Sequence, residues 1–307
     1  MKRERIYLYD TTLRDGQQTQ GVNFTVDDKI RISNALDELG IDYVEGGWPG
    51  ANPTDSDFFN TNPKLKATFT AFGMTKRSGK SAENDEVLSA VLNANTPGVC
   101  LVGKAHDFHV IKALGISLEE NLSNISDSVR HIVSKGREAL FDCEHFFDGY
   151  RENPTYALKA AKVAYEAGAR WIVLCDTNGG ALPSQVFSAT KAVIDSGIPG
   201  DRIGIHTHND TEHAIANSLA AIDAGARQVQ GTLNGLGERC GNANLVTLIP
   251  TLLLKDPYSS LYETGVDLNK LSSLTSISRT LDDILNRVPD KWAAYVGSSA
   301  FAHKAGL

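Results

Sequence analysis

The stretch RIYLYDTTLRDGQQ, residues 5–18, begins as an apolar run and ends in charged and amide side chains. The apolar part has the composition of a buried strand, and charge at the end of a buried strand is costly unless something neutralises it. A doubly wound open sheet would usually carry a glycine-rich turn at this place. Arg14 and Asp15 stand there instead, which favours a (β/α)8 barrel, whose active site lies at the C-terminal ends of its strands.

Further apolar runs follow, separated by helical stretches. The candidate strands are 5–10, 41–47, 66–72, 98–103, 138–144, 170–176, 202–208 and 227–232. Residues 26–39 have apolar side chains on one helical face behind Thr25, a favourable N-cap residue. A second helix is expected to start at Pro154 and to end at Gly168. Strand–helix units repeated over roughly 250 residues predict an α/β protein with the TIM-barrel fold.

The pattern changes after about residue 255. Residues 256–307 contain helical pieces without a further strand–helix repeat, and the chain stops at Leu307 without a polar tail. We therefore predict a catalytic barrel over residues 1–255 and a small helical linker or subdomain over 256–307, which we expect to be truncated before a regulatory domain.

Composition argues against several classes of protein. The net charge of −7 makes a nucleic-acid partner unexpected, because such proteins usually present a basic face. The 4 cysteines lie far apart without a C-x-x-C pair, which indicates neither a disulfide framework nor a structural zinc site. No apolar run approaches the ~18 residues of a membrane span. We expect a cytoplasmic protein that acts on small molecules.

Polar side chains follow most of the predicted strands, at ends that a barrel brings to one mouth. His206 and His208 are two apart on a strand, so both leave the same face, roughly 6–7 Å apart along it. With Asp15 they offer two imidazoles and a carboxylate, a set suited to Mn²⁺, Mg²⁺, Fe²⁺, Co²⁺ or Zn²⁺ as a Lewis acid. A lone H-x-H more often holds one core histidine and one exposed one. The other polar strand ends favour the metal site.

Three motifs occur in order along the chain: LYDTTLRDGQQ, HTHND and GLGERCGNANL. Together they resemble the α-isopropylmalate synthase, homocitrate synthase and citramalate synthase family of metal-dependent barrels, over essentially the whole chain. VEGGWPGANPTD and FDCEHFFDGYRENPTYAL are most similar to the long citramalate synthase branch. The resemblance implies an acyltransferase that condenses acetyl-CoA with pyruvate to give citramalate and CoA, in isoleucine or leucine biosynthesis. 2-Isopropylmalate and homocitrate synthesis are the alternatives within the family.

The resemblance also implies where the metal binds. It places a divalent ion, Mn²⁺ or Mg²⁺ with Zn²⁺ or Co²⁺ as alternatives, on Asp15, His206 and His208. Asn242 is expected close by, as a further ligand or through water. A homodimer with exchanged segments is implied as well.

The substrates are expected to meet a second set of residues. The resemblance implies that Arg14 neutralises the oxygen of the 2-oxo acid and that Thr177 holds its carboxylate. Glu144 matches the family's active-site carboxylate. Gln18 and Glu45 are expected as neighbours of the acyl-CoA.

Two other functions fit part of the pattern. Carbon–carbon lyases such as hydroxymethylglutaryl-CoA lyase or 4-hydroxy-2-oxo acid aldolases share LRDG and H-x-H, but the CoA-ester lyase has a GGCP-like loop where this chain reads GERCGNAN. A barrel that binds ligand without catalysis is the third reading. The family carries an H-x-x-G-x-H-like stretch whose last histidine assists the chemistry, whereas this chain ends at HKAGL. We therefore expect these 307 residues to bind metal and oxo acid but to condense slowly.

Overall fold

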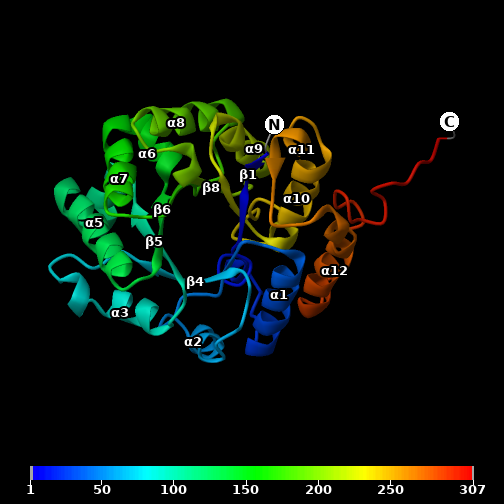
Figure 1. Cartoon of the computed structure of the whole chain (residues 1–307), viewed down its shortest axis with the longest axis horizontal. Coiled ribbons are helices and arrows are strands. Elements are labelled where there is room, and N and C mark those ends of the chain that lie inside the picture. The colour runs from blue at the N-terminus through cyan, green and yellow to red at the C-terminus, as the bar shows by residue number, and fades with distance from the viewer. Residues whose placement is uncertain (1–2, 306–307) are drawn as a thin grey trace.

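Eight parallel strands form a closed barrel in the computed structural model, which describes residues 3–305 (Figure 1). Each strand pairs with both neighbours, and β9 closes the ring on β2. The barrel strands are β2 (Tyr7–Asp10), β3 (Tyr43–Glu45), β4 (Thr68–Met74), β5 (Gly98–Lys104), β6 (Glu138–Glu144), β7 (Trp171–Asp176), β8 (Ile203–Thr207) and β9 (Gln228–Gly231). All eight predicted strands are confirmed, and with them the (β/α)8 class.

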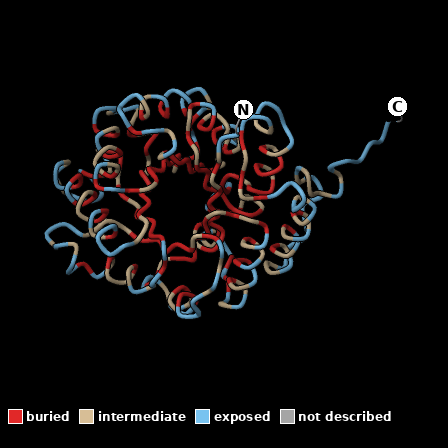
Figure 2. Tube along the Cα trace, viewed as in Figure 1, coloured by how far each residue is buried: buried red, intermediate tan, exposed pale blue. Residues whose placement is uncertain are grey.

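Helices surround the barrel, and every barrel strand is followed by at least one (Figure 1). They are α1 (Val26–Leu39), α2 (Pro53–Asn60), α3 (Glu86–Asn93), α4 (Asp107–His109), α5 (Leu118–Ser134), α6 (Phe146–Glu152), α7 (Pro154–Glu166), α8 (Pro183–Asp195), α9 (Ala214–Ala224), α10 (Leu245–Leu254), α11 (Tyr258–Leu261) and α12 (Leu274–Ile284). Figure 2 shows buried chain around the ring of strands and exposed chain on the outer helices. Within the described residues, none of these helices is long and apolar enough to cross a membrane.

The start and end of α1 follow from local side-chain chemistry. The Thr25 hydroxyl accepts from the Asp28 N–H at 3.2 Å while the Asp28 carboxylate accepts from the Thr25 N–H at 3.0 Å, a reciprocal capping box. The helix ends at Gly40, whose φ of 102° is a left-handed conformation that glycine adopts without strain. A Cβ at Gly40 would lie 2.5 Å from the Gly265 carbonyl oxygen, so this end of the helix also needs glycine for space.

The barrel interior has an apolar part and a polar part. Tyr9, Tyr43 and Trp171 belong to an inner cluster of buried side chains, which fills the barrel as a core. Among these side chains lie buried polar groups, including Glu45 and Asp142. Since buried carboxylates are rare unless they are paired, their partners determine what the mouth of the barrel can hold.

The segment after α10 differs from its prediction in one respect. A two-residue strand β10 (Tyr262–Glu263) pairs in parallel with β1 (Glu4–Arg5), so the appendage is not purely helical. Arg5 holds it by donating to the Thr264 carbonyl at 2.5 Å. Two residues are too short to show a periodic pattern, which is why the strand was missed. Beyond it α12 packs on α1, and the chain then runs away from the barrel (Figure 1).

Candidate active site

A pocket of about 310 Å³ opens at the C-terminal ends of the strands. Seven of the predicted site residues line it: Arg14, Asp15, Gln18, Glu144, Thr177, His206 and His208. Lys104 and Glu238, polar residues at strand ends, also line it, and the wall is completed by side chains that the sequence did not single out: Trp48, Phe72, Met74, Val102, Asp142 and Cys175. The location is the one expected for a barrel enzyme.

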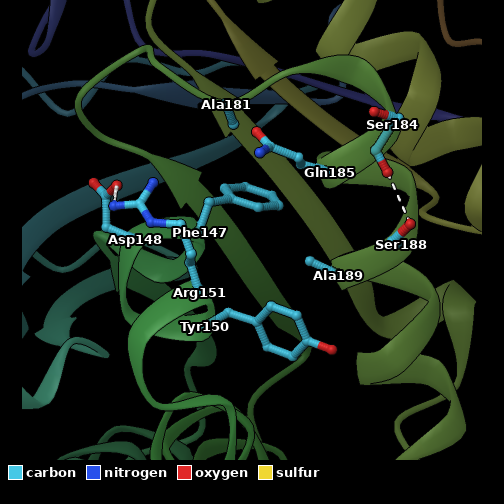
Figure 3. Close-up of a pocket in the computed structure, with 9 residues that line it drawn as sticks. All are labelled: Phe147, Asp148, Tyr150, Arg151, Ala181, Ser184, Gln185, Ser188 and Ala189. Atoms are coloured by element: carbon cyan, nitrogen blue, oxygen red, sulfur yellow. Dashed lines mark hydrogen bonds and ion pairs between the residues drawn. The ribbon is translucent and has the colours of Figure 1, made fainter.

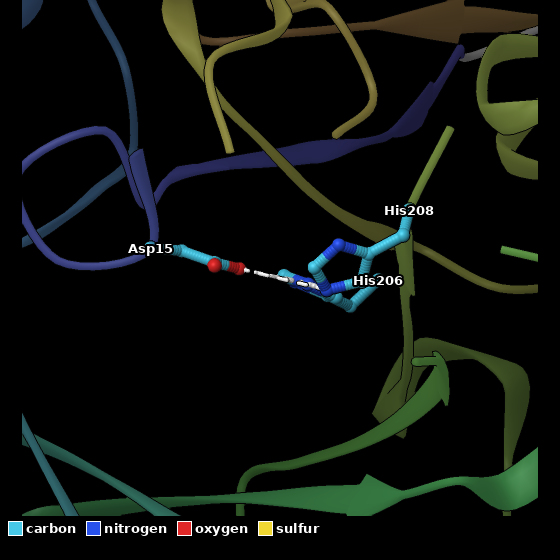
Figure 4. A group of neighbouring side chains, drawn as sticks. All are labelled: Asp15, His206 and His208. Atoms are coloured by element: carbon cyan, nitrogen blue, oxygen red, sulfur yellow. Dashed lines mark hydrogen bonds and ion pairs between the residues drawn. The ribbon is translucent and has the colours of Figure 1, made fainter. Parts of the chain in front are cut away.

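Asp15, His206 and His208 converge inside this pocket (Figure 4). The His206 Nε2 atom lies 3.1 Å from Asp15 Oδ2 and 3.4 Å from His208 Nε2, and the His208 Nε2 atom lies 4.0 Å from the same oxygen. Asp15 comes from the loop after β2, His206 from β8 and His208 from just beyond β8. The barrel topology thus brings together residues almost 200 positions apart in sequence.

The orientation of His206 is set by a glutamine on the neighbouring strand. Its Nδ1 atom lies 2.9 Å from Gln230 Oε1, and the Gln230 Nε2 group donates to Asp142 Oδ1 at 3.2 Å. Because an amide oxygen only accepts, Nδ1 carries the proton in a neutral imidazole. The Nε2 lone pair of His206 then points toward Asp15 and His208, as a metal ligand requires.

The donor set fits a divalent cation. Two imidazole nitrogens and a carboxylate oxygen face one another, all within 4.8 Å, in a buried space. Lone pairs placed so close repel unless a proton or a cation lies between them. Asn242 is buried next to His208, with which it forms an isolated β-bridge, and among residues 3–305 neither polar atom of its side-chain amide has a hydrogen-bond partner. Such unpartnered buried atoms mark a missing ligand or water.

The charges of Asp15, His206 and His208 shift one another's pKa values. Burial alone would raise the pKa of Asp15, but Arg14 and the two histidines outweigh it and hold that pKa well below its usual range. Burial alone would lower the pKa of His206, but Asp15 outweighs it and the net shift is upward. Burial and the charge of His206 lower the pKa of His208 to about 4. Asp15 is therefore a carboxylate and His208 a neutral imidazole at neutral pH.

Arg14 is held on three sides. Its Nε donates to Glu45 Oε2 at 2.6 Å, its guanidinium carbon lies 3.9 Å from the centre of the Phe72 ring, and Nη1 lies 3.8 Å from Asp15 Oδ2. Burial alone would lower the pKa of Arg14, but Glu45 and Asp15 outweigh it and raise that pKa. The guanidinium is therefore a permanent, fixed positive charge at the pocket, suited to an anionic oxygen.

Glu45, which the resemblance led us to expect as a neighbour of the acyl-CoA, is 0% exposed and is not among the residues that line the pocket. Its carboxylate accepts from Arg14 and, at 2.9 Å, from the Tyr9 hydroxyl. Glu45 is thus the counter-ion and support of Arg14. Asp10, also in the opening stretch, accepts from the N–H and the hydroxyl of Thr12, both at 2.8 Å, and so shapes the turn.

Two further predicted residues, Thr177 and Glu144, line the pocket and are held in place by neighbouring groups. The Thr177 hydroxyl oxygen accepts from the His145 N–H at 2.9 Å, which leaves its own hydrogen free to donate. Glu144 forms an ion pair with Lys104, the residue opposite it on β5. Both Lys104 and Glu144 line the pocket, so this pair lies at its wall.

Asp142 and Gln230 are site residues that sequence reasoning missed. Both stand at inward positions of their strands. Asp142 lies two residues before the end of β6, and Gln230 alternates with an apolar neighbour in β9. Asp142 precedes Glu144 by two positions and therefore leaves β6 on the same face. That alternation was the available signal, and burial raises the pKa of Asp142 as expected for a carboxyl in the barrel interior.

A second hollow of about 340 Å³ lies outside the barrel, between α6 and the start of α8 (Figure 3). Phe147, Tyr150 and Ala189 give it apolar walls, and Arg151 pairs with Asp148 at 2.9 Å on its edge. None of the residues that line it belongs to the carboxylate–histidine cluster. The chemistry therefore points to the pocket in the barrel mouth.

The fold and the site together define a (β/α)8 barrel with a buried carboxylate–histidine cluster in its mouth. The HMGL-like family model matches residues 5–277, and the chain belongs to that family. The match continues past residue 255, the predicted end of the barrel part, into α12.

The chain is similar to two kinds of synthase in sequence and to a lyase in fold. The (R)-citramalate synthase of Synechocystis sp. is 50% identical over 100% of this chain, which spans 57% of that relative's length. The 2-isopropylmalate synthase of Sulfolobus acidocaldarius is 34% identical over 99% of this chain, which spans 75% of that relative's length. A solved HMG-CoA lyase from Acinetobacter baumannii, in complex with coenzyme A and 3-methylmalate, shares the fold with a TM-score of 0.75 at 22% identity, covering 99% and 98% of the two chains.

Proposed function

We propose that this chain carries the catalytic barrel of a metal-dependent enzyme that condenses acetyl-CoA with pyruvate to give citramalate and CoA. The observation that carries the proposal is the placement of Arg14 beside the Asp15, His206 and His208 cluster in one pocket. The 50% identity to an (R)-citramalate synthase supports the choice of reaction.

We propose Asp15, His206 and His208 as the metal ligands, with Asn242 beside them. A divalent cation bound there would supply a Lewis acid for the keto oxygen of the oxo acid. Carboxylate and imidazole ligands with open positions suit Mn²⁺, Mg²⁺, Co²⁺ or Zn²⁺. The pairing of His206 with Gln230 supports this assignment, because it leaves Nε2 free to bind.

Arg14 and Thr177 would orient the 2-oxo acid. Negative charge moves to the keto oxygen as the new carbon–carbon bond forms, and a fixed guanidinium there stabilises the transition state more than the ground state. The free hydroxyl hydrogen of Thr177 would donate to the substrate carboxylate. Both residues are held by the protein before substrate arrives, by Glu45 and by the His145 N–H respectively, so little reorganisation is needed.

Glu144 would act on the acyl-CoA. The methyl group of acetyl-CoA is a weak carbon acid, so its deprotonation needs a positioned base. Glu144 would remove a methyl proton, and the methyl carbon would bond to the keto carbon of pyruvate as the carbon–oxygen double bond opens. The keto oxygen would take up a proton and become a hydroxyl, which balances the proton removed by Glu144. Water would then add to the thioester carbonyl, and the carbon–sulfur bond would break to give the carboxylate of citramalate, the CoA thiol and a proton. Lys104, the ion-pair partner of Glu144, and Gln18, a neighbour for the acyl-CoA, line the same pocket.

The apolar side chains of the pocket bear on which 2-oxo acid binds there. Phe72, Met74 and Val102 form an apolar wall of the pocket, which suits a short side chain such as the methyl group of pyruvate. The lower identity of 34% to a 2-isopropylmalate synthase makes 2-oxoisovalerate the second candidate. One methylene group more or fewer on the substrate changes its binding in an apolar pocket by about 1–3 kcal/mol. That difference is enough for a clear preference between pyruvate and 2-oxoisovalerate.

Release of CoA from acetyl-CoA, followed with a thiol reagent, tests the proposal. The chain is incubated with Mn²⁺ and with pyruvate, 2-oxoisovalerate or 2-oxoglutarate in separate reactions. We expect thiol release with pyruvate to exceed that with each other acid by about tenfold or more, and to stop on removal of metal. Equal rates with all three acids, or a rate that survives chelation, would reject the assignment.

We also propose that the working form is a cytoplasmic homodimer. The segment after α12 runs away from the barrel and carries Trp292 and Phe301, which are 71% and 78% exposed, so a second copy would cover them (Figure 1). The four cysteines are unpaired, as a reducing compartment requires. Gly306 and Leu307, the last two residues of the HKAGL stretch, lie outside the described residues. Light scattering on the purified chain at micromolar concentration decides between one and two copies.

A further inference from the structure

A lysine without access to solvent lies behind the mouth of the barrel. Lys29 on α1 is 0% exposed, and its ammonium donates to the carbonyl oxygen of Leu13 at 2.8 Å, to that of Gly46 at 3.0 Å and to Asp55 Oδ1 at 2.5 Å. Three acceptors are the full complement for an ammonium group. Burial lowers the pKa of Lys29, and Asp55 opposes that shift. Lysine is almost never buried so completely without a structural demand.

The two carbonyl groups belong to the loops that hold the guanidinium of Arg14. Leu13 directly precedes Arg14, in the loop after β2. Gly46 directly follows Glu45, whose carboxylate accepts from Arg14 Nε at 2.6 Å. The Lys29 ammonium therefore links the backbone beside the cation to the backbone beside its counter-ion.

Asp55 extends the same connection to the aromatic wall of the pocket. Its second oxygen accepts from the Trp48 N–H at 2.8 Å. Trp48 packs edge-on against Phe72 with ring centres 5.4 Å apart, and Phe72 faces the Arg14 guanidinium. The loop lies directly on this carboxylate, because a Cβ at Gly47, with φ of 146°, would come within 2.5 Å of the Asp55 carboxyl carbon. The turn after β3 is thus shaped around Asp55.

We infer that Lys29 is a positioning residue: by tying the loop after β2 to the loop after β3, it sets where the Arg14 guanidinium stands for the 2-oxo acid. This inference rests on the proposed function only for the identity of the ligand. Packing alone does not require the charge, since a buried ion pair replaced by apolar or neutral groups of similar volume often leaves stability unchanged. The ammonium is distinguished by its reach to two loop carbonyls and a carboxylate at once.

The decisive variant removes the tether without leaving an unpaired charge. In Lys29→Met/Asp55→Asn the methionine keeps an unbranched apolar side chain, and the asparagine oxygen still accepts from the Trp48 N–H. The matched control is Lys162→Met. Lys162 on α7 also donates to two backbone carbonyls, those of Ser196 and Gly197 at 3.3 and 3.2 Å, but it is on the surface away from the mouth.

Backbone amide hydrogen exchange, followed by mass spectrometry, reads the positioning directly and does not depend on any activity. We expect peptides covering residues 11–18 and 46–52 to exchange about tenfold faster together in the double variant, with the peptides of β6 and α7 unchanged. Unchanged exchange in either loop, or faster exchange spread evenly over the chain, would overturn the inference. Should the double variant not fold, Lys29→Gln/Asp55→Asn also removes both charges but keeps an amide donor for part of the tether, and it is expected to give the same pattern at smaller amplitude.

Calorimetry with pyruvate in the presence of Mn²⁺ adds the functional readout. We expect pyruvate to bind the double variant about tenfold more weakly than the wild-type chain, because Arg14 is displaced, while Lys162→Met binds normally. Unchanged pyruvate affinity in the folded double variant would overturn the inference. If the wild-type chain binds no pyruvate, the proposed function fails, and the exchange experiment still decides the role of Lys29.

Discussion

Replacing Glu45 by glutamine separates the two roles considered for this residue. Glu45 is fully buried, and its carboxylate accepts from Arg14 Nε at 2.6 Å and from the Tyr9 hydroxyl at 2.9 Å. Glutamine keeps the shape and one acceptor oxygen but removes the charge that fixes the guanidinium. If Glu45 supports Arg14, the substitution impairs use of the oxo acid. If it contacts the acyl-CoA, as the sequence led us to expect, the KM for acetyl-CoA changes instead.

The structure sets the size of the expected effect. Removing one partner of a buried ion pair typically costs about 3–5 kcal/mol. Here Asp15, 3.8 Å from the guanidinium, remains as a second anion and the amide oxygen still accepts, so we expect a loss nearer the ~2 kcal/mol of one hydrogen bond to a charged group. A displacement of Arg14 by about 1 Å should lower kcat/KM for pyruvate by about 10²-fold, with the KM for acetyl-CoA little changed.

Steady-state thiol release, with each substrate varied in turn, measures both constants, and urea unfolding measures stability. Glu138→Gln is the matched control, because Glu138 accepts from the Tyr43 hydroxyl at 2.7 Å at the start of β6, the opposite end of that strand from Glu144. It should cost stability without affecting pyruvate. A folded Glu45→Gln variant whose kcat/KM for pyruvate stays within about twofold of wild type would refute the support role.

The remaining predictions concern the metal and Arg14. Arg14→Ala should abolish turnover yet leave Mn²⁺ affinity intact, whereas Asp15→Ala should weaken Mn²⁺ binding itself; equal loss of Mn²⁺ in both, seen by calorimetry, would contradict this division. Gln230→Leu should weaken Mn²⁺ binding about 10–100-fold by freeing the ring of His206, and unchanged affinity would show that the Gln230 contact is incidental. Asp15 holds the pKa of His206 above its ordinary value of 6.5 against the effect of burial, so below that raised pKa the incoming metal must displace a proton. Mn²⁺ affinity should therefore rise with pH while His206 is protonated and level off once His206 is neutral, with about one proton released per ion on the acid side of the raised pKa and fewer on its alkaline side; titrations in buffers of different ionisation enthalpy over a range of pH measure this, and proton release that does not change with pH would count against it.

The barrel and the convergence of Asp15, His206 and His208 were accessible to sequence reasoning for a common reason. Short apolar runs alternating with amphipathic helices specify the fold, and the fold then places every strand end at one mouth. Asp15, His206 and His208 each follow such a run, so their convergence required no knowledge of side-chain packing. The positions of Arg14, Glu144 and Thr177 in the same pocket follow in the same way.

The features that could not be predicted depend on how deeply a side chain is buried and on its tertiary contacts, not on its position along the chain. Glu45 ends β3 as the strand-end rule expects, but β3 has only 3 residues and its last side chain remains inside the barrel. Lys29 lies within the helix predicted over residues 26–39, and nothing in its spacing shows that two loop carbonyls accept hydrogen bonds from it. Strand β10 forms because Arg5 and Thr264 meet in three dimensions. Each of these features is decided by tertiary contacts, which local patterns do not contain.

The central claim is that this pocket joins the methyl carbon of acetyl-CoA to the keto carbon of pyruvate. Incubation of the chain with acetyl-CoA labelled with ¹³C at the methyl carbon, unlabelled pyruvate and Mn²⁺, followed by mass spectrometry, tests it most directly. We predict citramalate that carries one labelled carbon, formed by the wild-type chain and not by Arg14→Ala. Labelled acetate without labelled citramalate, or labelled product in equal amount from the variant, would contradict the account.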